Sequence, residues 1–430
     1  MAEVLQRQYS AIDSSRLFRM PWTPADNSLS WLEPTRKCNI TCDACFATND
    51  SRSEKSLEAI ETDLETILRQ RKCDGILIAG GEPLTHPRIA DVVRLVRRRH
   101  LKPVLVTNGV GLDAAWLREL KRAGVFGFSF HVDRHQARPG WTGKNELELN
   151  ALRQYFADLL YQERGLTCAF TATIFPDTLE DVPAIAAWVA RNVDRVQAFT
   201  FTCVRLFSPS EPFEYYAGGR RVDLAETIYH TDVPYRRLTS AELLAEVKRA
   251  LPDFELCAFL GGTVLPRAVK WAVGVRVGTT RQAYGSVGPK AMEIIQNGHH
   301  FLRGRFLAFA PPGSARRGRL LFFLSPWDRG VRRILKRYLW SCVLQPLNLV
   351  RRIHVQNIIV EQPIDVLETG EQDHCDGCPN KTPWRGRLVS ACVLEQYIRY
   401  EAPIIAVPRT GTPDGASPGE ALGKAGRLRA

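Results

Sequence analysis

Three cysteines fall within eight residues of this chain, Cys38, Cys42 and Cys45. Thiolates are the usual ligands of iron–sulfur clusters, so three on one short loop can hold three irons of a [4Fe–4S] cube and leave the fourth iron open. Zinc sites usually have two C-x2-C pairs or include histidine, and no His follows closely here. Nothing marks the chain as secreted, which disfavours a disulfide. The spacing therefore predicts an iron–sulfur loop rather than three unrelated cysteines.

Apolar, strand-like runs alternate with helical patterns over the first half of the chain. Strands are expected at 29–33, 75–79, 104–107, 126–132, 169–175 and 196–202, with helices between them, for example at 57–70, 89–99 and 114–123. Sequential parallel strands need helical crossovers, so six such repeats predict an α/β fold with a parallel sheet, closed or partly closed into a (β/α)6 barrel. Catalytic groups are then expected on loops at the carboxyl ends of the strands.

The cysteine loop follows the first expected strand, and the turn Gly80-Gly81-Glu82-Pro83 follows the second. This C-x3-C-x2-C loop followed by Gly-Gly-Glu-Pro resembles the radical S-adenosylmethionine (SAM) superfamily over about residues 28–210. The resemblance implies that the cysteines bind a [4Fe–4S] cluster whose open iron is chelated by SAM. It implies one-electron cleavage of SAM to a 5′-deoxyadenosyl radical, hydrogen abstraction from unreactive carbons, and a low-potential electron donor of the ferredoxin or flavodoxin type.

The same resemblance suggests which residues contact SAM. It places Gly81 and Glu82 near the methionine ammonium, while Gly80 allows close approach and Pro83 stiffens the turn. The family usually has an aromatic residue before the third cysteine, where this chain has Ala44; Phe46, just after it, is the expected replacement. Further expected contacts are Thr107 and Asn108 at the third strand end, His131 and Asp133 at the fourth, and Arg205, which would bind a carboxylate. Strand-end caps and turns are the alternative for the polar residues, and a surface arginine is the alternative for Arg205.

A second cysteine group lies near the C-terminus. Cys375 and Cys378 form a C-x2-C pair, and Cys392 follows after thirteen intervening residues. The spacing predicts an auxiliary metal site, a second [4Fe–4S] cluster in preference to zinc. Cys257 is the expected fourth ligand, with Cys342 and His374 as weaker candidates. Cys73, Cys168 and Cys203 lie in apolar contexts typical of buried small side chains.

A narrower resemblance rests on His131–Asn150, Phe175–Leu179 and Cys375–Pro379. These segments are similar to one radical SAM branch, which contains archaeal tetraether lipid synthases and methanopterin-ring methylases, over about residues 28–400. The branch joins or methylates carbons with the help of auxiliary clusters. It often has a further cysteine site before the SAM loop, but residues 1–37 of this chain contain no cysteine.

Composition is that of a large enzyme without a membrane span. The chain has 430 residues, 45% of them hydrophobic, which suffices for a large core and two or three domains. The first residues contain no apolar run typical of a secretion signal, and no uncharged apolar stretch of about 18 residues occurs. Eleven cysteines without a secretion signal indicate a reducing compartment, so we expect a cytoplasmic protein, peripheral to a membrane at most.

Positive charge is concentrated between Phe301 and Arg352. This segment has twelve Lys and Arg residues against one acid, Asp328, while the whole chain carries +12. Within it, Val331, Ile334, Leu335, Tyr338, Leu339 and Cys342 recur with helical period, opposite Arg332, Arg333, Lys336 and Arg337. A membrane-surface helix and a core-packed helix with a solvated basic face both fit. Nucleic-acid binding is disfavoured because no recognition motif accompanies the charge.

We expect four parts: an N-terminal extension 1–27, a radical SAM core 28–245, a C-terminal domain 246–404 with the auxiliary site, and a disordered tail 405–430. Residues 311–318 are expected to form a mobile loop.

C–H chemistry suits a substrate without an acidic or electrophilic handle. A lipid chain delivered to the barrel mouth along 331–339 is the favoured substrate, with a soluble pterin or peptide as the alternative. The rival class is a non-catalytic metal-stabilised protein, which would need no Gly-Gly-Glu-Pro pocket.

Overall fold

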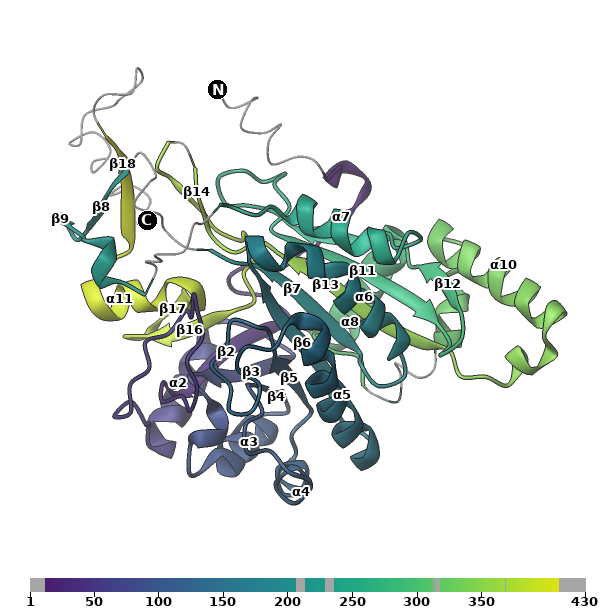
Figure 1. Cartoon of the computed structure of the whole chain (residues 1–430), viewed down its shortest axis with the longest axis horizontal. Coiled ribbons are helices and arrows are strands. Elements are labelled where there is room, and N and C mark those ends of the chain that lie inside the picture. The colour runs from purple at the N-terminus through teal and green to yellow at the C-terminus, as the bar shows by residue number, and fades with distance from the viewer. Residues whose placement is uncertain are drawn as a thin grey trace.

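A sheet of eleven strands runs through the molecule (Figure 1). The structure, a computed structural model, describes residues 12–205, 213–228, 236–311, 313, 318–367 and 369–409. The strand order is β1-β10-β11-β13-β7-β6-β5-β4-β3-β2, and β12 pairs with β11. The strands are β1 (Phe18–Arg19), β2 (Leu29–Thr35), β3 (Gly75–Gly80), β4 (Lys102–Thr107), β5 (Gly127–His131), β6 (Thr167–Ile174), β7 (Ala198–Cys203), β10 (Ala258–Leu260), β11 (Trp271–Gly278), β12 (Ala283–Ser286) and β13 (His354–Glu361).

Strands β2 to β7 are parallel neighbours in chain order, which confirms the six expected βα repeats and the α/β fold. The connecting helices are α2 (Leu57–Gln70), α3 (Ile89–Arg98), α4 (Ala114–Ala123), α5 (Glu146–Glu163) and α6 (Val182–Arg191). Side-chain caps begin three of them, because Ser56, Asp113 and Asn145 each accept a hydrogen bond from a backbone N–H of the first turn. The sheet is open at its β2 edge, as in a partial barrel.

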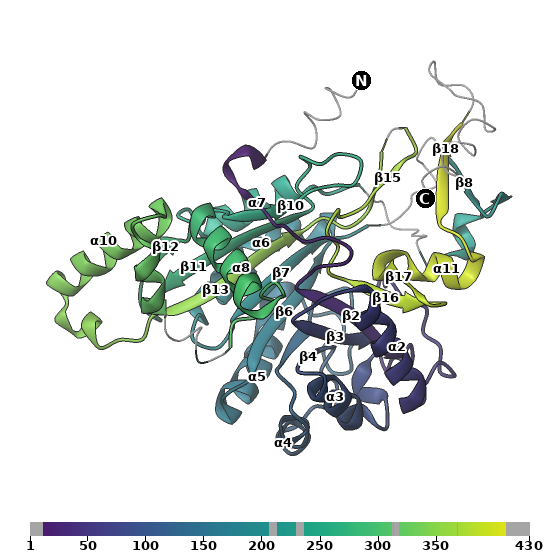
Figure 2. The same cartoon turned by 180° about the vertical axis from the view of Figure 1, so that it is seen from behind.

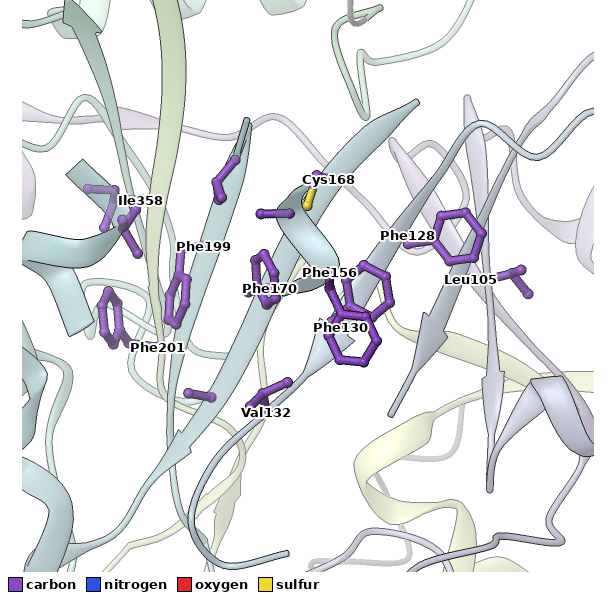
Figure 3. Packing of buried hydrophobic residues seen from close by; sticks show 14 of the residues in the cluster. Leu105, Phe128, Phe130, Val132, Phe156, Cys168, Phe170, Phe199, Phe201 and Ile358 are labelled. Atoms are coloured by element: carbon purple, nitrogen blue, oxygen red, sulfur yellow. The ribbon is translucent and has the colours of Figure 1, made fainter. Parts of the chain in front are cut away.

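The two faces of this sheet differ in chemistry. The face toward the helices is aromatic and dry, with Phe128, Phe130, Phe170, Phe199 and Phe201 buried against α5 and α6 (Figure 3). Because side chains alternate along a strand, the intervening residues point to the opposite, inner face. On β5, β6, β7 and β13 these are Ser129, His131, Thr171, Thr173, Thr200, Thr202 and Glu361. The inner face near the carboxyl ends of these strands is therefore polar.

The sheet continues into the expected C-terminal domain. β13 pairs in parallel with β7, and β11 pairs antiparallel with β13, so residues well beyond 245 extend the same sheet. The N-terminal extension also joins it, because β1 pairs with β10. The expected boundaries at 27 and 245 therefore do not separate independent sheets. The backbone groups of β7 need a partner on this edge, and β13 supplies it.

Three small sheets lie beside the carboxyl ends of the strands (Figures 1 and 2). They are β14–β15 (Asp365–Val366 and Gln372–Asp373), β16–β17 (Lys381–Trp384 and Arg387–Ser390), and β18-β8-β9 (Ile404–Pro408, Phe213–Ala217 and Arg220–Arg221). Helix α11 (Leu394–Tyr400) lies among them. β18 shows that order extends past the expected tail start at 405, because Ile404 and Ala406 are buried against β8. Residues 410–430, and most of the expected loop 311–318, lie outside the described residues.

Helix α10 (Arg329–Leu344) lies at the far end of the molecule from these small sheets (Figures 1 and 2). Its face with Val331, Ile334, Tyr338 and Cys342 is buried against Tyr284 of β12, with ring centroids of Tyr284 and Tyr338 5.6 Å apart. The alternative of a core-packed helix is therefore correct for this face. The position of the helix does not support the expectation that it delivers a lipid to the barrel mouth. The helix precedes the amino end of β13, whereas the mouth lies at the carboxyl end.

A buried ionic network joins the residues next to β7 and β11 to β15, the strand that precedes Cys375. Lys270 Nζ lies 2.7 Å from Asp365 Oδ2 and 3.1 Å from Asp373 Oδ2, and Arg205 Nε lies 2.8 Å from Asp365 Oδ1. All four side chains are buried. Burial alone would raise the pKa of Asp365, but Arg205 and Lys270 outweigh it and lower the pKa to about 2.

We expect Asp365→Asn to lower the free energy of unfolding by about 3–5 kcal/mol at pH 7, because two buried cations lose their shared carboxylate. A depressed pKa stabilises the folded state above the unfolded value near 3.9, and this stabilisation is lost as pH falls toward about 2. Urea titrations from pH 7 to 3 measure it: the deficit should stay constant down to about pH 4.5 and then shrink. The control is Glu119→Gln, at an exposed position of α4. A deficit below about 1 kcal/mol at pH 7 would contradict the assignment.

Candidate iron–sulfur and SAM site

The glycine turn and the entrance to the cysteine loop are held together by backbone contacts. Gly81 N donates to Thr35 O at 3.0 Å, and Glu82 N donates to Lys37 O at 2.8 Å. A Cβ on Gly81 would lie 2.4 Å from the carbonyl oxygens of Arg36 and Lys37, and one on Gly80 would lie 2.2 Å from Thr35 O. Gly80 also has φ +111°, which only glycine adopts readily. These two glycines are thus needed for the chain to approach itself and to fix where the cysteine loop starts.

The carboxylate of Glu82 points inward and connects the ends of β3 and β4. Its Oε1 accepts from Thr107 Oγ1 at 2.6 Å and from Leu84 N at 2.9 Å, and its Oε2 accepts from Asn108 N at 2.7 Å. Burial raises the pKa of this carboxyl although these donors favour the charged form. The Glu82 and Thr107 side chains are therefore bound to each other at the strand ends. Both thus match the alternative of a strand-end cap rather than a direct contact with SAM. Pro83 begins a short 3-10 turn, as expected of a turn former.

Asn108 is the residue through which the end of β4 reaches the cysteine loop. Its Nδ2 donates to Asn39 Oδ1 at 2.8 Å and lies 3.8 Å from Cys38 Sγ within hydrogen-bonding geometry. Its Oδ1 accepts from Val110 N at 2.8 Å. The amide is thus both a turn former and a contact of the first cysteine.

The segment after β5 pairs with the cysteine loop along its backbone. Asp43 N donates to His135 O at 2.9 Å, Ala137 N donates to Thr41 O at 2.8 Å, and a β-bridge joins Cys42 to Gln136. The His135 ring lies between Asp43 and Asp177, with nitrogen–oxygen distances of 3.0 and 3.1 Å. A loop that protrudes from β2 is therefore held from three strand ends.

Arg138 is a buried cation beside Cys42 that sequence patterns did not reveal. Its guanidinium donates to the backbone oxygens of Asn108 and His131 and to Gln136 Oε1. Burial and the neighbouring Asp133, Cys45 and Cys38 raise the pKa of the Cys42 thiol, whereas Arg138 lowers it. Arg138 Nε is buried without a hydrogen-bond partner among the described residues. A positive charge here stabilises thiolates, which cluster binding requires.

His131 and Asp133 form a pair at the end of β5. His131 Nε2 lies 2.8 Å from Asp133 Oδ2 and 3.1 Å from Thr173 Oγ1, and Thr173 N donates to the same carboxylate at 3.1 Å. Burial would raise the pKa of Asp133, but His131 and these bonds hold it below its usual value. The His131 side chain is about one-third exposed and lies at the carboxyl end of β5. Part of its imidazole ring is therefore accessible at the mouth of the barrel.

The cysteine loop offers the donors that a [4Fe–4S] cluster requires. Cys38 and Cys42 are half-buried and Cys45 is exposed. The charge of Cys45 acts on the Cys38 thiol, and the charges of Cys45 and Cys38 act on the Cys42 thiol. Ala44 adopts a left-handed conformation with φ +54°, which turns the chain just before Cys45, and Phe46 is 38% exposed. Among the described residues, no three His, Cys, Asp or Glu side chains are close enough to share one metal ion. The fit thus rests on the donor set and its position at the strand ends, and no ligand cage is preformed.

The second cysteine group lies near the carboxyl end of β13, where Glu361 ends the strand. Cys375 pairs by a β-bridge with Gly262. Removal from solvent raises the pKa of the half-buried Cys375 thiol, and the charges of Cys378 and Cys392 raise it further. Glu361, at the carboxyl end of β13, acts in the same direction on Cys375 and Cys392. Burial raises the pKa of Glu361 to about 7. The three cysteines therefore lie in one neighbourhood with a carboxylate that sequence patterns did not indicate.

The structure places Cys257 elsewhere. Its Sγ donates to Val273 O at 3.4 Å inside an apolar cluster that also contains Tyr284 and Cys342. Gly262, the β-bridge partner of Cys375, is five residues further along β10 and its continuation, about 16 Å in extended chain. Cys257 and Cys342 are thus both buried small side chains of this cluster, and we do not assign either as the fourth ligand. His374 adjoins the group, and burial together with Lys270 lowers its pKa to about 4.

Arg205 also differs from expectation. It is buried and bound to Asp365 and to Leu238 O at 2.6 Å, so it is neither a surface residue nor directed at a carboxylate of SAM. Glu395 of α11 is a buried carboxylate that sequence patterns did not indicate. It pairs with Arg36 and accepts a hydrogen bond from Thr48 Oγ1 at 2.6 Å. Both partners flank the cysteine loop. Glu395 therefore ties the first cysteine group to the helix that follows Cys392.

Comparison with known proteins agrees with this arrangement. The family model described as the radical SAM superfamily matches residues 32–189. The chain is 26% identical over 186 residues to a 7,8-dihydro-6-hydroxymethylpterin dimethyltransferase of Methanocaldococcus jannaschii, covering 40% of this chain and 35% of that protein. It is 32% identical over 97 residues to a PqqA peptide cyclase of Gluconobacter oxydans, covering 22% and 26%.

A solved structure of Streptococcus suis SuiB bound to precursor peptide SuiA is also similar, with 16% identity, 42% of this chain and 40% of that chain covered, and a TM-score of 0.34. The chain spans between about a quarter and two-fifths of the length of the first curated relatives it matches. The matched residues contain the cysteine loop, the glycine turn and the ends of β2 to β6. Residues 32–189 thus form a radical SAM domain.

Proposed function

We propose that this chain is a radical SAM enzyme with two iron–sulfur sites at the carboxyl ends of its strands. Cys38, Cys42 and Cys45 hold the catalytic [4Fe–4S] cluster, and Cys375, Cys378 and Cys392 hold an auxiliary one. When bound, cluster and SAM supply a 5′-deoxyadenosyl radical for hydrogen abstraction, fed by a ferredoxin- or flavodoxin-type donor. The observation that carries the proposal is the docking of the Gly80–Pro83 turn onto the cysteine loop, which a merely metal-stabilised protein would not need.

Chain residues around the first site have separate tasks in this proposal. Gly80 and Gly81 leave backbone space at the loop entrance, and Glu82 fixes the ends of β3 and β4. Arg138 favours the thiolate of Cys42. Asn108 Nδ2 donates toward Cys38 Sγ, which stabilises negative charge on that sulfur.

We propose a polar substrate, of pterin or peptide type, that is methylated or joined at carbon. The inner face offers hydroxyls of four threonines and a serine, the His131 imidazole and the Glu361 carboxyl, all suited to hydrogen-bonding a heteroaromatic or amide group. Relatives whose names contain a pterin and a peptide support this choice. A lipid chain, the second candidate, would require an apolar lining, and α10, the segment expected to deliver it, lies at the other end of the sheet.

The activity is tested by anaerobic reconstitution of the full chain with iron and sulfide, followed by dithionite and SAM. We expect 5′-deoxyadenosine to form, measured by liquid chromatography and mass spectrometry. The matched control is the Cys38→Ala/Cys42→Ala/Cys45→Ala chain treated identically. No 5′-deoxyadenosine from a protein whose cysteine loop holds four irons would refute the enzyme assignment.

Cys375→Ala should lower iron content from about eight to about four atoms per chain if both sites hold cubes. The loss should leave reductive cleavage of SAM at the first site. Iron quantitation and 5′-deoxyadenosine formation on the same preparation measure both. Cys257→Ala, a buried cysteine outside the group, serves as the control and should keep about eight irons. Iron lost equally from both variants would show that Cys257 belongs to the site after all.

A further inference from the structure

Helix α10 lies at one end of the molecule (Figures 1 and 2). The surface there is unusual because it is both strongly apolar and strongly basic. We define the tip surface as the exposed apolar side chains of α10, of the 3-10 segments η5 (Gly318–Leu324) and η6 (Pro346–Leu349), and of the residues next to them. They are Leu320, Phe323, Trp327, Leu339, Trp340, Val343, Leu344, Leu347, Leu349 and Val350. Each is more than half exposed, with Phe323 at 75% and Val350 at 77%. Folded chains rarely gather so many exposed large apolar residues without a partner.

The side chains of α10 divide between its two faces according to helical spacing. Val331, Ile334 and Tyr338 face the core. Trp340 and Leu344 are one turn apart on the opposite face, next to Leu339 and Val343. The outward face of α10 therefore ends in an exposed apolar patch that is not part of the hydrophobic core.

Positive charge precedes this patch on the same outward face. Arg329, Arg332 and Lys336 lie on the first turns of α10, and all are exposed. Arg333 and Arg337 pair with Glu255 and Asp253, but no acid among the described residues pairs with Arg329, Lys336 or Arg352. Arg319 joins η5 to η6 by donating to the backbone oxygens of Leu349 and Arg351. Basic and apolar groups thus form one continuous end of the molecule.

A polar pocket of about 250 Å³ includes Arg351 and Arg352, the two residues that follow Val350 of the tip surface. It is lined by Thr279, Thr280, Arg351, Arg352 and His354, together with Tyr161 and Asp194. Two guanidinium groups and two hydroxyls next to an exposed apolar patch are the donors that a phosphate headgroup takes. The pocket lies at the amino end of β13, on the side of the sheet end where the tip surface lies.

We propose that the tip surface binds an anionic lipid bilayer, with Trp327, Trp340 and the aliphatic residues entering the headgroup boundary and the basic residues facing lipid phosphates. A second copy of the chain fits less well, because a symmetric contact would bring two segments of net charge +11 together. Nucleic acid also fits less well, since exposed Leu and Val gain nothing against a phosphate backbone. Exposed tryptophan beside Lys and Arg is typical of membrane-surface elements. No helix among the described residues is long and apolar enough to cross a bilayer.

Co-sedimentation of the full chain with vesicles tests this proposal. Wild type should sediment with phosphatidylglycerol/phosphatidylcholine vesicles, much less with phosphatidylcholine alone, and less as salt increases. Trp340→Ser/Val343→Ser and Arg329→Glu/Lys336→Glu should each weaken binding by at least about tenfold. Neither pair includes a residue of the cysteine sites, so 5′-deoxyadenosine formation in solution should not change.

Matched controls carry the same chemistry on other surfaces. Leu147→Ser/Tyr155→Ser removes two exposed apolar residues of α5, and Arg98→Glu/Arg122→Glu reverses two exposed charges at the end of α3 and on α4. Both should bind like wild type, and circular dichroism melting checks that all variants fold. Three results would overturn the proposal: no sedimentation with anionic vesicles at low salt, equal losses in the controls, or a wild-type dimer that Trp340→Ser/Val343→Ser makes monomeric.

Discussion

Replacing Cys42 with alanine is expected to remove about four of about eight iron atoms per chain and to reduce 5′-deoxyadenosine formation to background. The charges of Cys45 and Cys38 raise the pKa of the Cys42 thiol and Arg138 lowers it. The backbone bridge to Gln136 holds Cys42 in place. Without this sulfur only two ligands remain, so the cluster loses both its attachment and its single open iron. Iron and sulfide quantitation with 5′-deoxyadenosine measurement on one preparation gives the result.

The matched control for Cys42 is Cys168→Ala. Cys168 is fully buried in β6 in the apolar core and lies far along the strand from the carboxyl end (Figure 3). This variant should keep its iron and its activity and lose only a little stability. Full iron content and activity in Cys42→Ala would remove the cysteine loop as the catalytic site.

Gly81→Ala should have a comparably large effect although it removes no ligand. The added Cβ would lie 2.4 Å from two carbonyl oxygens of the cysteine-loop entrance, and backbone cannot move aside as a flexible side chain can. We expect an overpacking cost of about 1–3 kcal/mol or more, together with loss of about four irons, because the turn and the loop must separate. Melting temperature and iron content measure the two parts.

Gly298→Ala is the control for Gly81→Ala. A Cβ on Gly298, within helix α8 (Pro289–Arg303), meets nothing within 4 Å. Alanine in a helix interior should stabilise by about 0.5–1 kcal/mol, so this variant should melt slightly higher and keep its iron. Normal iron loading and stability in Gly81→Ala would show that the turn does not hold the loop.

Local patterns predicted the repeating part of the fold well. Strands β2 to β7 and helices α2 and α4 depend on short-range periodicity, and Ser56 and Asp113 mark helix starts that are visible in sequence. The joining of β13 to β7 depends on contacts between residues some 160 positions apart, which no local pattern encodes. For the same reason the boundary expected at 245 did not correspond to the edge of a sheet.

Site residues divide in a similar way. The cysteines and the glycine turn stand out because few other functions need their spacing. Arg138, His135 and Glu395 look like ordinary surface residues in the sequence, and only the fold brings them against the cysteine loop. Arg205 is the opposite case: the strand-end position was expected correctly, but Asp365, 160 residues later, occupies its guanidinium.

Helix α10 shows why periodicity alone does not assign a surface. The apolar repeat at Val331, Ile334 and Tyr338 fits a membrane face and a core face equally well in the sequence, and in the structure β12 covers it. Trp340 and Val343, which fall outside that repeat, form the exposed face instead. A helix with two apolar faces can be assigned only when its packing partner is known.

The central claim is that the cysteine loop holds a cluster with one iron free to bind SAM. Electron paramagnetic resonance of the reduced Cys375→Ala/Cys378→Ala/Cys392→Ala chain tests it most directly, because only the first cluster remains. If one iron is free to bind SAM, we expect a [4Fe–4S]⁺ signal whose g-values shift when SAM is added. A signal of full intensity that SAM leaves unchanged would contradict it.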